Sequence, residues 1–111
     1  MSTVTTHVLD TGRGRPAAGV QVRLERVTDL GTEAVGGGTT DADGRIRELG
    51  PDGLTAGTYQ LVFGTGDYFA GAGQDTLYPE VTITFSITAD GGHYHVPLLV
   101  SPYGYTTYRG S

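Results

Sequence analysis

Residues 93–111 read HYHVPLLVSPYGYTTYRGS and are the most informative stretch of this chain. Successive side chains of a β-strand point to opposite faces. On that period, one face of the first half is aliphatic, and we expect it to belong to the core: Val96, Leu98 and Val100. The other face mixes imidazoles with apolar groups: His93, His95, Pro97 and Leu99. Such a face is unusual in contact with water, so we expect another subunit, a ligand, or both to cover it.

The second half of this stretch is aromatic rather than polar. Pro102 and Gly104 are typical turn residues, so the chain should turn there. Residues 105–111 then alternate again, with Arg109 and Ser111 on one side and Tyr108 on the other. Terminal segments are usually polar and poorly ordered. An aromatic tail of this kind is therefore expected to be buried.

The remaining sequence favours many short strands over helices. Its 19 glycines stand among abundant threonine and valine, which is typical of strands joined by tight turns. The clearest strand is 81–88, where Val81, Ile83, Phe85 and Ile87 should face inward. Other strands are expected within residues 3–9, 20–25, 32–40, 45–49, 59–63 and 93–100. Seven or eight strands at regular spacing predict a β-sandwich.

The connections carry two further expectations. A short helix is predicted over residues 67–74, with Asp67 as its cap and Tyr68, Phe69 and Ala72 packing it. The run Gly36-Gly37-Gly38 lacks the lysine of a phosphate-binding loop, so it reads as a mobile hairpin. Residues 41–44, Asp-Ala-Asp-Gly, should form a turn that delivers Arg45 onto a short strand.

Composition excludes several classes of protein. The chain has 111 residues, which predicts a single domain over 1–111. Its net charge of −5 and scattered arginines argue against nucleic acid as a partner. The N-terminal residues lack the pattern of a signal peptide, and no stretch is long and apolar enough for a membrane span. The absence of cysteine rules out thiolate chemistry and is compatible with a reducing compartment, so we expect a cytoplasmic protein.

The histidines offer the first candidate site. His93 and His95 are spaced to lie on one side of a strand, and with His7 they could form a three-histidine zinc site. No spacing of carboxylates supports that reading. An ordinary surface or packed pair of histidines is the plainer interpretation, and catalysis without a metal is the third.

A metal-free site would draw on histidine and arginine. An unperturbed imidazole titrates near 6.5, which suits it to exchanging protons at neutral pH. Guanidinium groups can hold a carbonyl or an oxyanion. The candidate residues for a water-activating site are His7, Arg45, His95, Tyr108, Arg109 and Ser111. The plainer alternative is that Arg45 and Arg109 simply solvate the surface.

Several motifs are more specific: Thr6-His7-Val8-Leu9-Asp10-Thr11, Gly14-Arg15-Pro16-Ala17, Asp43-Gly44-Arg45, Tyr78-Pro79-Glu80-Val81, the strand from His93 to Leu99, and Tyr108-Arg109-Gly110-Ser111. Together they resemble the transthyretin-related 5-hydroxyisourate hydrolases, over essentially the whole chain. The resemblance implies a transthyretin (prealbumin)-like β-sandwich of two four-stranded sheets with one short helix. It also implies a homotetramer with its sites at the dimer–dimer interface.

The resemblance further implies an activity. The expected reaction is the hydrolysis of 5-hydroxyisourate to 2-oxo-4-hydroxy-4-carboxy-5-ureidoimidazoline in urate degradation, with no metal and no organic cofactor. Catalytic roles fall on His7, Arg45, His95 and Ser111, and substrate binding on Tyr108, Arg109 and Gly110. We favour His7 as the base and His95 for positioning, with the reverse open. The main alternative is a transthyretin-type carrier of small, thyroid-hormone-like molecules that lacks catalysis.

Overall fold

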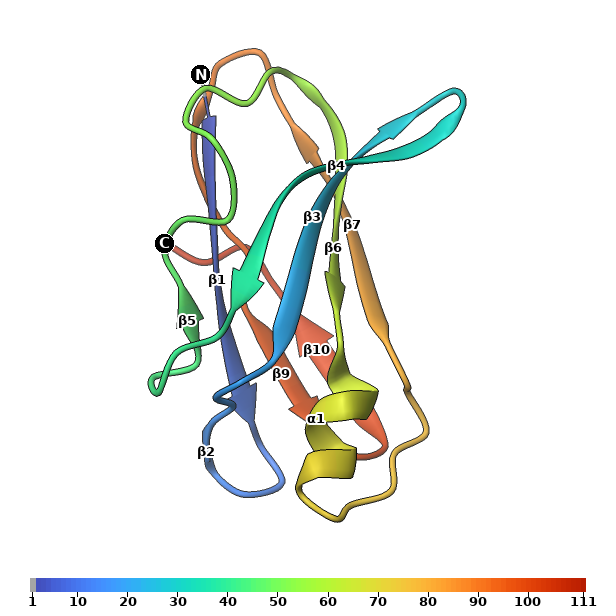
Figure 1. The fold of residues 1–111 in the computed structure, drawn as a ribbon. Coiled ribbons are helices and arrows are strands. Elements are labelled where there is room, and N and C mark those ends of the chain that lie inside the picture. The colour runs from blue at the N-terminus through green and yellow to red at the C-terminus, as the bar shows by residue number, and fades with distance from the viewer. Residues whose placement is uncertain (1) are drawn as a thin grey trace.

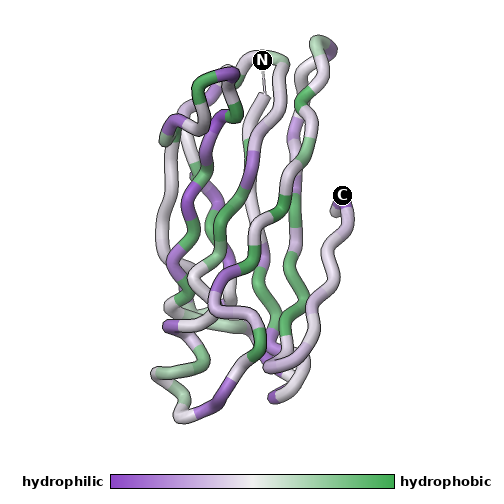
Figure 2. Tube along the Cα trace, turned by 90° about the vertical axis from the view of Figure 1, so that its right-hand side faces the viewer, coloured by the Kyte–Doolittle hydropathy of each residue, from purple (hydrophilic) through white to green (hydrophobic). Residues whose placement is uncertain are grey.

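The computed structural model describes residues 2–111, which form two β-sheets packed face to face with a short helix at one end (Figure 1). The predicted β-sandwich with one short helix is therefore confirmed, although one sheet contains six strands where four were expected. Hydrophobic and hydrophilic residues alternate along the strands (Figure 2). This alternation gives each sheet one face for the core and one face for the outside.

The first sheet is built around its longest strand. Its members are β1 (Ser2–Asp10), β2 (Arg15–Pro16), β5 (Arg45–Ile46), β8 (Gly92–His95), β9 (Leu98–Ser101) and β10 (Gly104–Thr107). The order along the sheet is β10-β9-β1-β2, and β5 and β8 also pair with β1. β1 runs parallel to β8 and β9 and antiparallel to β2 and β5. Segments far apart in the sequence thus meet on β1.

The second sheet is antiparallel throughout. Its members are β3 (Gln21–Thr28), β4 (Gly31–Thr39), β6 (Gly57–Phe63) and β7 (Val81–Ile87), in the order β4-β3-β6-β7. The core between the sheets includes Val8, Leu61 and Leu98, all fully buried. Val96, Leu98 and Val100 are buried as the alternation predicted. On β7, Val81 and Ile87 are buried, whereas Ile83 and Phe85 are half-buried because this strand lies at the edge of its sheet.

The helix differs in detail from the prediction. α1 (Thr65–Gly71) begins two residues before the expected start, and Gly64 occupies its N-cap without a side-chain hydrogen bond. Asp67 is therefore not the cap, although it lies in the first turn, where an acidic side chain is favourable. Thr65 fixes the start of the helix by donating a hydrogen bond to the carbonyl of Tyr78 (2.9 Å). Phe69 is the residue of α1 whose side chain is buried in the core.

The glycine run lies in one strand of a hairpin, and the strand expected within residues 32–40 is confirmed as β4. Gly36, Gly37 and Gly38 lie within β4 and pair with β3. A Cβ atom on Gly36 would overlap the carbonyl oxygen of Leu49 and lie 2.7 Å from the Cα of Gly50. Gly36 therefore allows the 49–50 backbone to cross β4 closely, whereas a Cβ atom on Gly37 would lie 2.8 Å from the Val22 carbonyl oxygen. β5 ends at Ile46, short of the expected end at residue 49, because the chain bends at Arg47.

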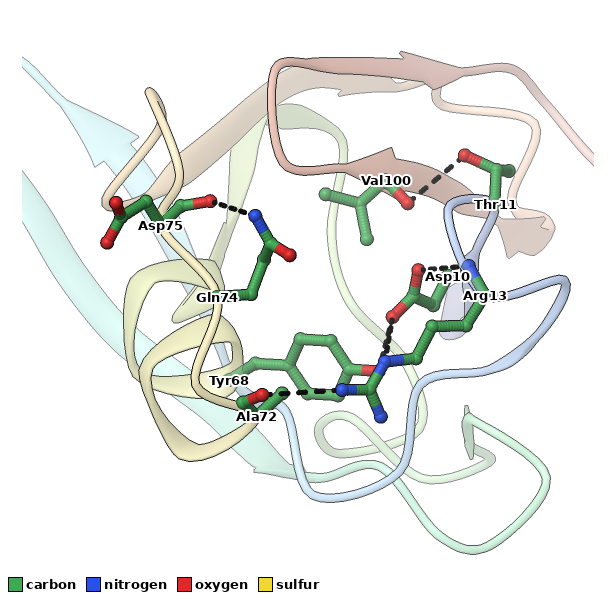
Figure 3. A network of polar contacts seen from close by, with 8 residues as sticks. All are labelled: Asp10, Thr11, Arg13, Tyr68, Ala72, Gln74, Asp75 and Val100. Atoms are coloured by element: carbon green, nitrogen blue, oxygen red, sulfur yellow. Dashed lines mark hydrogen bonds and ion pairs between the residues drawn. The ribbon is translucent and has the colours of Figure 1, made fainter.

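A buried carboxylate ties α1 to the end of β1 (Figure 3). Asp10 is 1% exposed and accepts hydrogen bonds from the Tyr68 hydroxyl (2.7 Å) and the Arg13 backbone amide (3.1 Å). The Arg13 guanidinium also reaches the Ala72 carbonyl (3.4 Å) and lies 4.0 Å from Asp10. Burial and the bond to Asp10 raise the pKa of Tyr68 to about 12.

Tyr68→Phe should lower the free energy of unfolding by about 1–3 kcal/mol, because it leaves a buried carboxylate short of a donor. The raised pKa of Tyr68 also makes this stabilisation depend on pH in the alkaline range. The folded state holds the phenol proton more tightly than the unfolded state, so this stabilisation is complete below pH 10.0 and is lost as the pH rises toward about 12. Urea titrations at pH 7 and across that range measure both effects. Tyr103→Phe, at an exposed tyrosine, is the matched control, and equal losses in both variants would contradict the prediction.

Candidate active site

Three strands bring the candidate residues to one outer face of the first sheet. β1 supplies Thr3, Thr5 and His7, because the residues that alternate with them are buried between the sheets: Val4, Thr6 and Val8. Strand pairing then sets their neighbours. Thr3 pairs with His93 and Thr5 with His95 across the parallel β1–β8 ladder. His7 pairs with Arg45 across the antiparallel β1–β5 ladder.

A hollow of about 240 Å³ opens on this face. Its lining consists of Thr5, Thr6, Arg45, Ile46, Arg47, His93, His95 and Ser111. The tail reaches the hollow through a backbone hydrogen bond from Gly110 to the His95 carbonyl (2.8 Å). A Cβ atom on Gly110 would overlap the His95 ring, so glycine lets the tail lie against the imidazole. Arg45, His95 and Ser111 are thereby gathered around one space.

His7 is held by a single backbone group. Its Nε2 lies 2.9 Å from the Asp43 carbonyl oxygen. A carbonyl can only accept a hydrogen bond, so Nε2 must carry the proton. The turn of residues 41–44, stabilised by a bond from the Gly44 amide to the Asp41 carbonyl (2.9 Å), positions that oxygen. In the neutral ring, Nδ1 is then the basic nitrogen of His7.

His95 lies in a different environment. Its Nδ1 is 2.8 Å from the hydroxyl oxygen of Thr5. Burial lowers the pKa of His95 below its ordinary value, and the positive charge of Arg45 and the nearby rings of His7 and His93 lower it further. These surroundings favour the neutral form of His95, which is the form that a general base requires.

The remaining tail residues lie outside this hollow. Tyr108 and Arg109 line a second, more apolar hollow of about 260 Å³, between β7 and β8. The Arg109 guanidinium stacks over the Tyr94 ring at 4.5 Å and reaches the His93 carbonyl at 3.5 Å. Tyr108 is 56% exposed, so the single chain does not bury the aromatic tail. A role for these two side chains at the site stays a prediction.

Another hollow lies apart from the site. A larger hollow of about 610 Å³ lies beside α1, is lined by Arg13 and Arg15 among others, and contains none of the predicted site residues. Among residues 2–111, no group of three histidine, cysteine or acidic side chains is placed to hold a metal ion. The three-histidine zinc arrangement is therefore not formed. The described part of the chain also has no helix long and apolar enough to cross a membrane.

Sequence reasoning missed three residues of this site. Thr5 and Arg47 line the hollow but received no role, and His93 was considered as a metal ligand or an ordinary surface or packed histidine but not as part of a catalytic site. A signal for Thr5 was present, because Thr3, Thr5 and His7 share one face of a strand at a period of two. Arg47 carried no such signal, and its guanidinium pairs with Asp41 at 3.0 Å.

Comparison with known proteins shows the wider relationship. The sequence profile of the HIUase/Transthyretin family matches residues 4–110. The chain belongs to this family. A 5-hydroxyisourate hydrolase of Caulobacter vibrioides is 47% identical over 115 residues, covering 100% of both chains. The corresponding hydrolase of Salmonella typhimurium is 48% identical over 109 residues, which cover 97% of this chain and 80% of that protein.

Solved structures of the HIUase/Transthyretin family have the same fold. The 5-hydroxyisourate hydrolase of Klebsiella pneumoniae superposes with a TM-score of 0.89 at 41% identity, covering 99% of this chain and 100% of that one. Sea bream transthyretin in complex with thyroxine superposes with a TM-score of 0.91 at 30% identity, covering 97% and 94%. The fold is thus shared by a hydrolase and a hormone-binding protein, so function has to be argued from the site.

Arg45→Gln should raise the pKa of His95 toward its ordinary value, because it removes a nearby positive charge that disfavours the imidazolium. Titration of the His95 ring protons by NMR measures this directly and needs no substrate. Arg47→Gln is the matched control, since its charge is already compensated by Asp41. The electrostatic account of the site is wrong if the His95 titration midpoint falls or does not move in Arg45→Gln.

Proposed function

We propose that this protein hydrolyses 5-hydroxyisourate to 2-oxo-4-hydroxy-4-carboxy-5-ureidoimidazoline, a step of urate degradation. The chain is a cyclic amide hydrolase, and its relatives from Caulobacter and Salmonella are named 5-hydroxyisourate hydrolases. One observation carries the proposal. A half-buried imidazole of lowered pKa, a guanidinium and a hydroxyl lie around the same small hollow: His95, Arg45 and Ser111.

The proposed reaction opens the six-membered lactam ring of the substrate with water. His95 takes a proton from water at Nε2, and the resulting hydroxide attacks the lactam carbonyl. Arg45 stabilises the oxyanion that develops on the carbonyl oxygen. The ring C–N bond then breaks, and the imidazolium returns its proton to the departing nitrogen. The product is left with a carboxylic acid, which releases its proton to solvent and becomes a carboxylate. No metal or organic cofactor takes part in these steps.

This assignment exchanges the roles of the two histidines, because the sequence favoured His7 as the base and His95 for positioning. The lowered pKa of His95 supports it as the base. His7 pairs with Arg45 across the β1–β5 ladder but does not itself line the hollow of the single chain, and we assign it to bind and orient the substrate from the edge of the site. Ser111 would hold the edge of the substrate from the tail side. The roles of Tyr108, Arg109 and Gly110 are to shape the pocket.

The proposed working form is a homotetramer with its sites at the dimer–dimer interface. Its support is the exposure of the tail in the single chain, where Tyr103, Tyr105 and Tyr108 all lie on the surface. The hollow of about 240 Å³ is also open to solvent on the face that the first sheet turns outward. A second pair of subunits against this face would exclude water and complete the pocket. Sedimentation at micromolar concentration tests the assembly.

Ultraviolet absorbance tests the activity. Urate oxidase acting on urate generates 5-hydroxyisourate in the cuvette, and its decay is followed with and without this protein. We expect the decay to accelerate in proportion to protein concentration. An unchanged decay would refute the proposed reaction. Binding of thyroxine without any acceleration would instead favour the carrier function of transthyretin.

A further inference from the structure

A continuous chain of hydrogen-bonding groups runs beside the proposed base. The Thr5 hydroxyl oxygen lies 2.8 Å from Nδ1 of His95 and 3.0 Å from Nε2 of His93. Nδ1 of His93 lies 2.7 Å from the hydroxyl oxygen of Thr3. The four groups alternate between the neighbouring strands β1 and β8, and the parallel pairing of Thr3 with His93 and Thr5 with His95 fixes their spacing.

The Thr5 hydroxyl restricts what the two rings can do. A hydroxyl has a single hydrogen to donate, and it can accept through its lone pairs. It cannot donate to His93 and His95 at once. If it donates to Nε2 of His93, then Nδ1 of His95 has to carry a proton and donate to Thr5. If it donates to Nδ1 of His95 instead, Nε2 of His93 has to be the donor. Accepting from both rings would leave the hydroxyl hydrogen without a partner among residues 2–111, at the cost of a hydrogen bond.

The first arrangement is the one that a base at His95 needs. Nε2 of His95 makes no hydrogen bond within residues 2–111, so it is the nitrogen left to meet water or substrate. In a neutral imidazole one nitrogen carries the proton and the other accepts. Nε2 can accept a proton only if Nδ1 already carries one. The Thr5 oxygen must then accept from Nδ1, and its hydrogen must point to His93.

We propose that Thr5 and His93 are positioning residues that hold His95 in its Nδ1–H tautomer. His93 accepts the Thr5 hydrogen at Nε2 and donates from Nδ1 to Thr3, so every hydrogen bond in the chain has one donor and one acceptor. The inference deepens the proposed function and rests on it, because it assigns His95 as the base. Neither Thr5 nor His93 touches the reacting atoms in this scheme. They act through the ring of His95, as a neighbouring group commonly does for a histidine.

The surroundings explain why such support is needed. His7 and Arg45 approach His95 from β1 and β5, and Arg47 lines the same hollow. These groups bring donors or positive charge, and none offers a carboxylate to hold the Nδ1 proton. Within residues 2–111, Nδ1 of His95 has one hydrogen-bond partner, the Thr5 hydroxyl. His93 is exposed at the rim, where its ring completes the chain.

The first test measures the tautomer and needs no substrate. Long-range proton–nitrogen NMR correlations distinguish a protonated ring nitrogen from a bare one. At a pH where His95 is neutral, we expect Nδ1 protonated and Nε2 bare in the unaltered protein. Thr5→Val keeps the side-chain shape but removes the hydroxyl, and should move the population toward Nε2–H. Thr5→Ser keeps the hydroxyl and should restore the original spectrum.

The second test measures turnover of 5-hydroxyisourate. Thr5→Val and His93→Phe should each lower kcat by about 10-fold or more, with KM changed by less than about 2-fold, since they alter the orientation of a catalytic group and not substrate binding. Thr5→Ser should stay within about 3-fold of the original kcat, because the chain of donors is kept. Thr82→Val, at an exposed threonine on β7, is the matched control and should leave kcat unchanged.

The outcomes separate this inference from the proposed function. No turnover by the unaltered protein would refute the function. If the unaltered protein turns over the substrate while Thr5→Val keeps both its kcat and the His95 tautomer, the positioning role alone is refuted. An Nε2–H tautomer of His95 in the unaltered protein would also refute it. If Thr5→Val fails to fold, His93→Phe at its exposed position decides the question by the same two measurements.

Discussion

His95→Ala should lower kcat/KM for 5-hydroxyisourate by about 10²-fold or more, the usual effect of removing a general base. His7→Ala and Arg45→Ala should each cost about as much, because the first removes a group that orients the substrate and the second removes the charge that stabilises the oxyanion. Initial rates at several substrate concentrations measure these losses. Thermal melting of each variant establishes that the sandwich is still folded.

Arg23→Ala is the matched control for these losses. Arg23 lies on β3 in the opposite sheet, paired with Glu25 at 3.4 Å, and is remote from the hollow. Its removal should leave kcat/KM unchanged. A near-normal rate in a folded His95→Ala variant would remove His95 from the mechanism. The same outcome for His7 or Arg45 would remove that residue alone.

Gly36→Ala should lower the free energy of unfolding by about 3 kcal/mol or more, at or above the upper range for overpacking. The added methyl group would overlap the Leu49 carbonyl and crowd the Gly50 Cα at 2.7 Å. Both obstacles are backbone atoms, so no side-chain rotation relieves them. The 49–50 segment would have to move away from β4, taking with it the fully buried side chain of Leu49. Urea denaturation followed by circular dichroism measures the loss.

Gly71→Ala gives the opposite expectation at another glycine. Gly71 is the last residue of α1, and a Cβ there would meet nothing within 4 Å. Alanine reduces the freedom of the unfolded chain and favours the helix, so this variant should gain about 0.4–1 kcal/mol. Similar stability changes in the two variants would show that the close crossing at Gly36 does not limit substitution.

The sandwich could be predicted because alternation marks its strands directly. Val81, Ile87, Val96 and Leu98 are buried at the spacing that the sequence shows. The helix start could not be placed correctly, since Gly64 offers no capping side chain to mark it. The close packing around the glycine run could not be predicted for a related reason. Gly36 is required by the crossing of residues 49–50, and Gly37 lies close to the Val22 carbonyl; neither contact leaves a local pattern in the sequence.

The site was predictable in its chemistry and not in its arrangement. Histidine and arginine stood out as residue types, but the pairing of His7 with Arg45 and of Thr5 with His95 depends on which strands lie beside β1. No local pattern specifies a parallel pairing between segments about ninety residues apart. The side chain of Arg109 likewise turns to Tyr94, a partner that alternation alone does not identify.

The parallel pairing of β1 with β8 and β9 also bears on how the protein folds. β1 cannot complete its ladders until residues 92–101 are available, so many native contacts join distant parts of the chain. Topologies dominated by such long-range contacts fold slowly, in about milliseconds to seconds. During synthesis on the ribosome, Thr5 and His7 therefore wait for most of translation before meeting the strand that carries His93 and His95. Activity should accordingly emerge late, after the rest of the sandwich has begun to collapse.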